Sequence, residues 1–315
     1  MSAANYIIAS LVVTTTAIGV GISQGLTNQA AFKAIDIQPQ AQDDIRKLSL
    51  LSSTLIETAA ILGVFISILL FLQEKTPIDA FYTDISKIGI AVAMIASGFT
   101  VAMVSAWPAQ QACYAVARQP FMGNWIFNFT LIVLSVIQTP LILAFIVAFL
   151  IKAQASQVTS LADSLRLIGA GVAIGLGCIG PAFGLAHFAK TAFQGIGRNR
   201  NSAARILTFT FISQAIIESP VIFAMVVSLV LLLTGVPAGK EIAGYAMCAA
   251  GFATGLGTFG PGLSSGRTAA AACEQIANNP DNYASIARTS IFAQGVIDTA
   301  AIYVLLLSLI MIFFI

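Results

Sequence analysis

The sequence predicts an all-α membrane protein in which eight transmembrane helices pair as four tandem helical hairpins. First, 58% of its 315 residues are hydrophobic and only 9% are charged, which leaves too little polar surface for a water-soluble domain. Second, eight apolar runs are each long enough to cross a hydrocarbon layer of ~30 Å as a helix. Third, the sequence repeats about every 80 residues, so that four copies fill the chain.

The eight apolar runs give the expected spans in chain order. They lie at about 5–31, 48–72, 88–116, 124–151, 166–193, 204–234, 242–272 and 285–315. Taken in pairs, they predict hairpins over residues 1–76, 77–156, 157–236 and 237–315. No basic region precedes the first run and no clear cleavage site follows it, so we expect this run to stay in the mature protein.

Small residues at alternate positions mark the first helices of the third and fourth hairpins, and the series decays in the second and the first. The series is clear in the third copy, at Gly169, Gly171, Ala173, Gly175 and Gly177, and small residues recur at the same positions of the fourth copy. In lipid, small residues let helix backbones approach closely, because packing drives association there. Alternate positions spread over more than one face of a helix, so we expect the first helices to touch neighbours on several sides.

The second helix of each hairpin has one polar residue near its middle. These residues are Glu57, Gln138, Glu218 and Asp298, separated by 138 − 57 = 81, 218 − 138 = 80 and 298 − 218 = 80 residues. The three carboxylates lie about 11 residues into their helices, which is ~16 Å at 1.5 Å per residue. An ionised carboxylate near the bilayer centre costs at least ~2.5–3.5 kcal/mol. It should therefore be protonated, paired with a cation or facing a polar pathway.

The recurrence of this carboxylate indicates that it is used. A single buried carboxylic acid could serve as a neutral hydrogen-bond donor between helices. Three of them at one repeat position favour ion binding instead. A hydroxyl residue also follows every polar position, namely Thr58, Thr139, Ser219 and Thr299. Each hydroxyl could bond to the helix carbonyl one turn earlier or could contribute an oxygen to an ion site, and the sequence favours neither interpretation.

The polar loops within the copies keep the same register and hold most of the positive charge. The loop segments 37–39, 118–120, 198–200 and 278–280 each start 20 residues before the polar position. These loops and their flanks carry Lys33, Arg46, Lys47, Arg118, Lys190, Arg198, Arg200, Arg205, Arg267 and Arg288, whereas Lys75, Lys87, Lys152, Arg166 and Lys240 lie between copies. Ten basic residues against five predict cytoplasmic hairpin loops, with both termini on the opposite side.

Together these features resemble the c subunit, or proteolipid, of F-type ATP synthases. The resemblance rests on the small-residue first helix, the loop Arg118-Gln119-Pro120 and a buried Glu or Asp 20 residues after the start of the loop, and it covers the chain four times. It implies a homo-oligomeric rotor ring in the lipid of a bacterial inner membrane, with first helices inside and carboxylate helices outside. It further implies that the ring turns against an arginine of the stator a subunit. The chain itself should then be non-catalytic, with no cofactor and no nucleic-acid partner.

The resemblance assigns roles to particular residues. Glu57, Glu218 and Asp298 are the expected ion carriers, whereas Gln138 can neither exchange a proton nor carry a negative charge, so the second hairpin is expected to be a spacer. The expected contacts with the central-stalk subunits are Arg118, Gln119 and Pro120, with Arg198 and Asn199 in the third copy. The remaining loops depart from this pattern.

The transported ion is expected to be H⁺, with Na⁺ as the alternative. Sodium-type members of the family have a first-helix glutamine 33 residues before the carboxylate and a hydroxyl after it, as Gln24, Glu57 and Thr58 do here. Ser219 and Thr299 are further auxiliary candidates. At the glutamine position the later copies have Ser105, Leu185 and Ser265, which offer fewer oxygen ligands to a hard cation. Gln214 and Gln294, one turn before their carboxylates, could supply a missing ligand.

Three other functions compete with this interpretation. A V-type ATPase proteolipid is closely related, since such proteolipids are already duplicated and can lose a carboxylate in one hairpin. A secondary transporter could also have eight spans and internal repeats, although two-helix repeats run in parallel topology. A passive membrane scaffold would not need the buried carboxylates. The sequence leaves open the number of chains per ring, the presence of other c-type subunits, and whether the machine synthesises ATP or pumps ions.

Overall fold

The chain is a bundle of long helices, as the sequence predicts. The computed structural model describes residues 3–72, 80–237 and 240–314. Within these residues the regular structure is entirely helical, and eight helical segments are long and apolar enough to cross a membrane. They are Ala4–Ile37, Pro39–Phe71, Phe81–Arg118, Pro120–Ala155, Leu161–Arg198, Arg200–Leu233, Glu241–Asn278 and Pro280–Phe313. The protein is therefore an integral, multi-pass membrane protein. Lys75 and the predicted hairpin boundary at 76/77 lie outside the described residues.

Each hairpin consists of a first helix, a short 3-10 turn and an uninterrupted second helix. The first helices are α1 (Ala3–Ile37), α3 with α4 (Ala80–Ser86, Ile88–Arg118), α6 with α7 (Leu161–Gly177, Ile179–Arg198) and α9 with α10 (Glu241–Gly257, Phe259–Asn278). The turns are η1 (Pro39–Ala41), η2 (Pro120–Met122), η3 (Arg200–Ser202) and η4 (Pro280–Asn282). The second helices are α2 (Gln42–Phe71), α5 (Gly123–Ala155), α8 (Ala203–Leu233) and α11 (Tyr283–Phe313).

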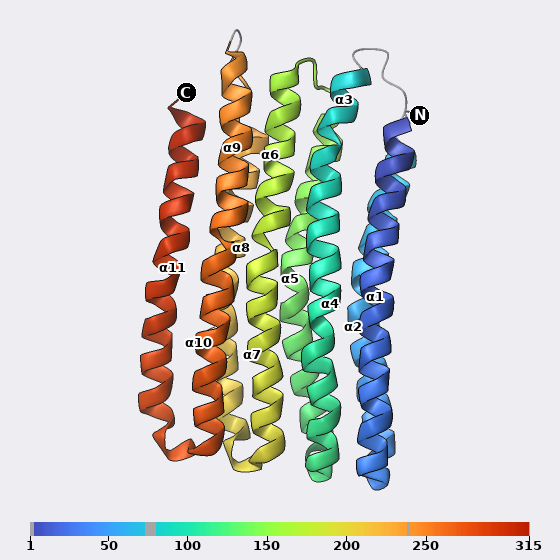
Figure 1. Ribbon diagram of the computed structural model, residues 1–315, viewed down its shortest axis with the longest axis vertical. Helices are drawn as coiled ribbons and strands as arrows, with labels where there is room; N and C mark the ends of the chain where they lie inside the picture. Colours follow the sequence, from blue (N-terminus) through green and yellow to red (C-terminus); the bar gives the residue numbers. More distant parts are fainter. Residues whose placement is uncertain (1–2, 73–79, 238–239, 315) are drawn as a thin grey trace.

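The breaks at Cys178 and Thr258 have a local cause. Pro181 and Pro261 follow them by three residues. A proline has no N–H to bond the carbonyl four residues earlier, which here belongs to the last residues of α6 and α9, Gly177 and Gly257. The helix axis continues across each break, so each pair of segments still acts as one span (Figure 1).

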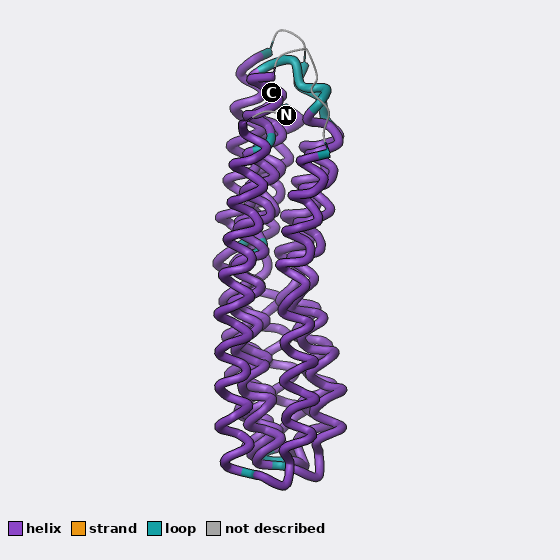
Figure 2. Tube along the Cα trace, turned by 90° about the vertical axis from the view of Figure 1, so that its right-hand side faces the viewer, coloured by secondary structure: helices purple, strands orange, loops and turns teal. Residues whose placement is uncertain are grey.

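The hairpins stand side by side in two layers (Figures 1 and 2). In one layer α1 packs on α4, α4 packs on α6 and α7, and these two pack on α9 and α10. In the other layer α2, α5, α8 and α11 contact each other in chain order. Both termini lie at one end of the bundle, and the turns lie at the other (Figure 2). Neighbours in the sequence repeat are thus neighbours in space.

Small residues bring the first helices into backbone contact. A Cβ atom added at Gly171 would collide with the backbone of Gly89 in the preceding copy, and one added at Gly251 would collide with the backbone of Gly169. Gly180 faces the following copy instead, where an added Cβ would meet the backbone of Phe259. The expectation that the first helices touch neighbours on several sides is confirmed.

Candidate functional site

Gln138 shows how the polar position of a second helix is enclosed. Its side-chain oxygen accepts from the Thr58 hydroxyl of α2 at 3.0 Å, and its side-chain nitrogen donates to the Ser105 hydroxyl of α4 at 3.2 Å. Thr58 comes from the preceding hairpin and Ser105 from the first helix of the same hairpin. Only 4% of Gln138 is exposed. We call these two hydroxyls and the position between them a polar cage. The amide of Gln138 finds both a hydrogen-bond donor and an acceptor there, and it carries no charge.

Asp298 has the same surroundings two hairpins later. Ser219 of the preceding hairpin donates to one carboxyl oxygen, and the Ser265 hydroxyl of α10 lies 3.2 Å from the other. The separations match those around Gln138, since 298 − 219 = 79 corresponds to 138 − 58 = 80, and both first-helix serines lie 33 residues back. The two hydroxyls can donate to an ionised carboxylate, and one can accept from the protonated acid. The cage therefore suits a group that gains and loses a proton.

Glu218 keeps the hydroxyl of the preceding hairpin but lacks the one from its own first helix. The Thr139 side chain hydrogen-bonds to it, whereas the residue 33 positions earlier is the buried Leu185. One turn before Glu218, Gln214 is 1% exposed, and neither polar atom of its side chain has a hydrogen-bond partner among the described residues. Leaving a buried amide unpaired costs ~1–3 kcal/mol. Gln214 is thus available to a water molecule or a cation beside Glu218.

Glu57 lies at the edge of the bundle, and the described residues include no hairpin that precedes it. Its side chain is exposed, in contrast to that of Asp298. The side-chain nitrogen of Gln24 donates to the Ser53 carbonyl at 3.1 Å. At the opposite edge of the chain, the Thr299 hydroxyl is exposed and donates to the Val296 carbonyl at 2.7 Å. Among the four polar positions of the described residues, only Glu57 lacks a hydroxyl from a preceding hairpin.

The hydroxyls contact both a helix carbonyl and a polar side chain of the next hairpin. Thr58 and Ser219 lie 2.8 and 2.7 Å from the carbonyl oxygens three residues earlier, and each also contacts the polar side chain of the next hairpin. The sequence places Thr58 with Glu57, but the structure places it with Gln138. The reason is helical geometry, because a residue lies about 100° around the helix from the one before it. Each hydroxyl therefore faces the following hairpin.

The turn residues tie neighbouring hairpins together. The Gln119 side chain donates to the Gly197 carbonyl at 3.4 Å, and the Asn199 side chain donates to the Ala277 carbonyl at 3.0 Å. Both bonds span 78 residues and so repeat one contact in successive copies. Gln119 and Asn199, which the sequence assigns to partner binding, are engaged between hairpins.

Other turn residues face outward. Arg118 is exposed and has no ion pair or hydrogen-bonded side-chain partner among the described residues, whereas Arg198 pairs with Glu274 at 3.3 Å. Pro120 begins η2, where its fixed φ suits the first turn of a helix. Phe121 follows it and is 99% exposed, a feature that the sequence pattern did not indicate. Arg118 and Phe121 together offer an open cationic and aromatic surface at the turn end.

Comparison with known proteins agrees with this architecture. The family model for the C subunit of ATP synthase matches residues 7–70, 168–231 and 248–311, or 64 + 64 + 64 = 192 of the 315 residues. The chain belongs to the ATP synthase c-subunit family. Each matched segment contains one of the three carboxylates, and the hairpin with Gln138 lies outside the matched residues.

The relatives are much shorter than this chain, and the matched segment of each is about the length of one hairpin. The ATP synthase c subunit of Dehalococcoides mccartyi (strain CBDB1) is 44% identical over 71 residues, which are 22% of this chain and 93% of that protein. That of Chloroflexus aurantiacus (strain ATCC 29366 / DSM 635 / J-10-fl) is 38% identical over 66 residues, 21% of this chain and 87% of the relative. That of Sulfurimonas denitrificans is 39% identical over 66 residues, 21% of this chain and 64% of the relative. This member of the family therefore fuses several family units in one chain, which explains its repeat.

Proposed function

We propose that copies of this chain close into the rotor ring of an ATP synthase, and that Glu57, Glu218 and Asp298 carry the transported ion. One observation carries the proposal. In copies two to four the preceding hairpin contributes a hydroxyl to the polar cage, while Glu57 has no preceding hairpin among the described residues and Thr299 is exposed at the other edge. A second copy set against the last hairpin places Thr299 of one chain beside Glu57 of the next. Repeating this head-to-tail contact produces a ring when the rotation closes.

The glycines at the two edges support the same arrangement. Gly262 and Gly266 of the last copy face the backbone of the preceding copy at Pro181 and Gly184. The corresponding residues of the first copy, 80 + 80 + 81 = 241 positions earlier, are Gly21 and Gly25, and an added Cβ at either meets nothing within 4 Å.

The edge formed by the fourth hairpin also has a glycine with open space beside it. Gly180 faces the following copy at Phe259, whereas its counterpart Gly260, 80 residues later, has open space. Glycines with open space beside them therefore lie at both edges of the chain. The equivalent glycines of the other copies contact a neighbouring helix. A neighbouring copy would use them in the same way.

H⁺ is the ion that the cages favour. The Asp298 cage supplies one carboxyl and two hydroxyls, which is enough to hold a proton and few ligands for a hard cation. The identically placed Gln138 shows that the cage accepts a neutral, hydrogen-bonded group. Na⁺ remains the alternative at Glu57, where Gln24 is near and Thr299 would arrive from the next chain, and at Glu218, beside the unpaired Gln214.

The spacer hairpin affects the coupling ratio. With Gln138 in place of an acid, each chain carries three ions per four hairpins that pass the stator arginine. Fewer ions per turn at a fixed number of ATP per turn favours ATP-driven pumping over synthesis at a given gradient. We place the hairpin turns on the cytoplasmic side of a bacterial inner membrane, with Arg118 and Phe121 toward the central stalk. The hairpins of residues 1–76, 77–156, 157–236 and 237–315 are the units of this ring.

A hydrophobic carbodiimide tests the proposal, because it modifies protonated carboxyl groups buried in a membrane. Mass mapping of labelled membranes is expected to find adducts on Glu57, Glu218 and Asp298. Protection of these residues by Na⁺ would identify sodium as the ion, whereas labelling that is independent of Na⁺ supports H⁺. Labelling of none of the three would contradict the rotor role and favour a passive scaffold.

A further inference from the structure

A pocket of about 320 Å³ lies between α10 and α11 of the fourth hairpin. Its walls include Thr268 and Ala272 of α10 and Ile286, Thr289 and Ala293 of α11. These side chains are small or aliphatic, and no aromatic ring of the described residues lines the pocket. The pocket is therefore apolar along much of its wall and has room for a large side chain.

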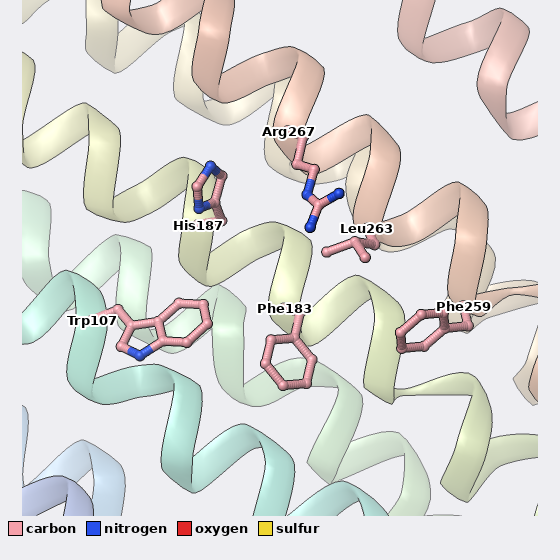
Figure 3. A pocket seen from close by; sticks show the side chains of 6 residues that line it. All are labelled: Trp107, Phe183, His187, Phe259, Leu263 and Arg267. Carbon is pink, nitrogen blue, oxygen red and sulfur yellow. The ribbon is translucent and has the colours of Figure 1, made fainter.

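A second pocket, of about 330 Å³, lies on the first-helix layer and differs in this respect. Its lining residues are Trp107, Phe183, His187, Phe259, Leu263 and Arg267 (Figure 3). They come from α4, α7 and α10, and the rings of Phe183 and Trp107 pack with centroids 5.7 Å apart. This pocket thus receives its aromatic rings from its own chain, whereas the pocket between α10 and α11 receives none.

The sequence repeat shows what occupies the equivalent place in an inner hairpin. Thr268 and Thr289 correspond to Phe188 and Phe209 of the third hairpin, since 268 − 188 = 80 and 289 − 209 = 80. Phe188 and Phe209 are fully buried, and their rings pack on each other with centroids 5.9 Å apart. The fourth hairpin therefore has a cavity where the third hairpin has two phenylalanine rings.

The junction between the second and third hairpins shows that a neighbour can supply such a ring. Phe193 of the third hairpin packs on Phe129 of the second, with ring centroids 5.0 Å apart, and Phe193 is fully buried. Phe129 is the counterpart of Thr289, since 289 − 129 = 160, which is two repeats. A first-helix side chain of the following hairpin thus reaches the position that Thr289 holds in the fourth hairpin.

Phe32 is the counterpart of Phe193 in the first hairpin, since 193 − 32 = 161, which is also two repeats. The second and fourth hairpins have Cys113 and Cys273 at this position, and both are fully buried. Phe32 is instead 70% exposed on α1. An exposed ring on the first hairpin therefore matches an empty pocket on the fourth.

We propose that Phe32 of one chain inserts into the pocket between α10 and α11 of the preceding chain. This inference rests on the proposed ring and names the contact that joins its chains. Adjacent first helices touch at residues 82 positions apart, as Gly266 and Gly184 do. By that spacing Cys273 lies beside residue 191, since 273 − 82 = 191, and Phe32 lies beside the equivalent residue of the fourth hairpin, Ala271. This residue is next to Ala272 in the wall of the pocket.

Ion pairs do not provide the fit at this junction. The ion pairs between the third and fourth hairpins are Arg198–Glu274 at 3.3 Å and Arg205–Asp281 at 3.4 Å. The residues at the equivalent positions across the chain junction are Asn278 with Lys33 and Ser285 with Gln40. Neither of these combinations joins opposite charges, so close packing of side chains determines how the chains fit.

Assembly of the purified protein in detergent, followed by native mass spectrometry at increasing chain concentration, tests the contact. Phe32→Ala leaves the pocket empty, and Thr268→Phe fills it from its own chain, so that Phe32 no longer fits. We expect each single variant to raise the concentration for half-maximal ring formation by about tenfold or more. The double variant should assemble like the wild type, because a phenylalanine facing a small residue reproduces Phe188 and Cys273 of the inner junction.

Phe292→Ala is the matched control and should leave assembly unchanged. Phe292 is 76% exposed on α11, and its counterpart Ile212 is also exposed in the inner third hairpin, so this position faces away from the neighbouring hairpins. Rings of wild-type stability from both single variants would overturn the pocket contact and leave the proposed ring standing. A double variant that assembles no better than the single variants would also overturn the contact. Single chains at every concentration of the wild type would contradict the ring itself and the contact with it.

Discussion

Asp298 and Glu57 hold the same position of the repeat but lie in different surroundings. Asp298 is 8% exposed and contacts one hydroxyl from the preceding hairpin and one from its own first helix. Glu57 is exposed, since no hairpin of the described residues precedes it. The difference shows that a carboxylate site in this protein is not the property of a single hairpin. The hydroxyl partners of Asp298 come from two hairpins, and in the proposed ring the corresponding junction at Glu57 forms between chains.

The largest expected effect comes from filling the open glycine edge. Gly25→Val places a side chain where the next copy should pack, so we expect association between chains to be lost while each chain still folds. Native mass spectrometry of the purified protein should then show single chains instead of a ring. Gly295→Val is the matched control, because Gly295 also has open space but lies on α11. Rings of unchanged size in the Gly25→Val protein would contradict the proposed junction.

A second substitution gives the second hairpin the carboxyl group that the other three hairpins already have. Gln138→Glu puts a carboxyl into a cage that already has Thr58 and Ser105. We expect the labelled carboxyls per chain to rise from three to four in carbodiimide mapping, since all four cages then hold an acid. Gln138→Leu should leave the number at three. If the introduced carboxyl stayed unlabelled while the other three reacted, the second hairpin would lack access to the ion path.

A third substitution removes a contact at a helix end that the third hairpin has and the fourth hairpin lacks. The Arg166 guanidinium donates to the carbonyl oxygens of Leu231 and Leu232, at 2.9 and 3.0 Å, and so caps the end of α8. The equivalent residue of the fourth copy is Ala246. Arg166→Met should lower the free energy of unfolding by about 1–3 kcal/mol, because it leaves the Leu231 carbonyl unpaired, whereas the Leu232 carbonyl keeps its bond from the Gln154 side chain. Thermal unfolding in detergent measures the effect, and Arg288→Met should show little change.

The smallest expected effect is at the turn end. Arg205 pairs with Asp281 at 3.4 Å between the third and fourth hairpins, and both side chains are exposed. Asp281→Asn should change the free energy of unfolding by less than ~1 kcal/mol, because solvent and salt screen such pairs. The same thermal measurement, repeated at high salt, should show no further difference from the wild type. A loss as large as that of Arg166→Met would mean that the turns, and not the small-residue contacts, hold the hairpins together.

Much of this fold could be predicted because the repeat is regular. The apolar runs set the eight spans, and the spacing of Glu57, Gln138, Glu218 and Asp298 identified the level of the sites. The partner of each hydroxyl could not be predicted in the same way. Whether Thr58 faces Glu57 or Gln138 depends on the rotation of α2 against α5, which the sequence period alone does not specify.

Two further structural features, the helix breaks and the pocket at His187, were not predicted from the sequence. The interruptions at Cys178 and Thr258 lie just before Pro181 and Pro261, but Pro140 and Pro220 lie inside continuous helices, so a proline in an apolar run did not by itself predict a break. The pocket at His187 and Arg267 was missed because its residues come from three hairpins and each looks isolated along the chain. Aligning the copies does place Trp107, His187 and Arg267 at one position. Only the packing of the first helices brings their side chains together around one pocket.

Cross-linking between chains tests the central claim most directly. In a protein whose four native cysteines are replaced by alanine, Glu57→Cys combined with Thr299→Cys is treated with a short thiol-reactive cross-linker. We expect covalent dimers and higher multimers, up to the size of the ring. The control pair Ser219→Cys with Asp298→Cys should cross-link within one chain, with no increase in mass. Efficient reaction of the control pair together with an edge pair that yields only single chains would contradict the account.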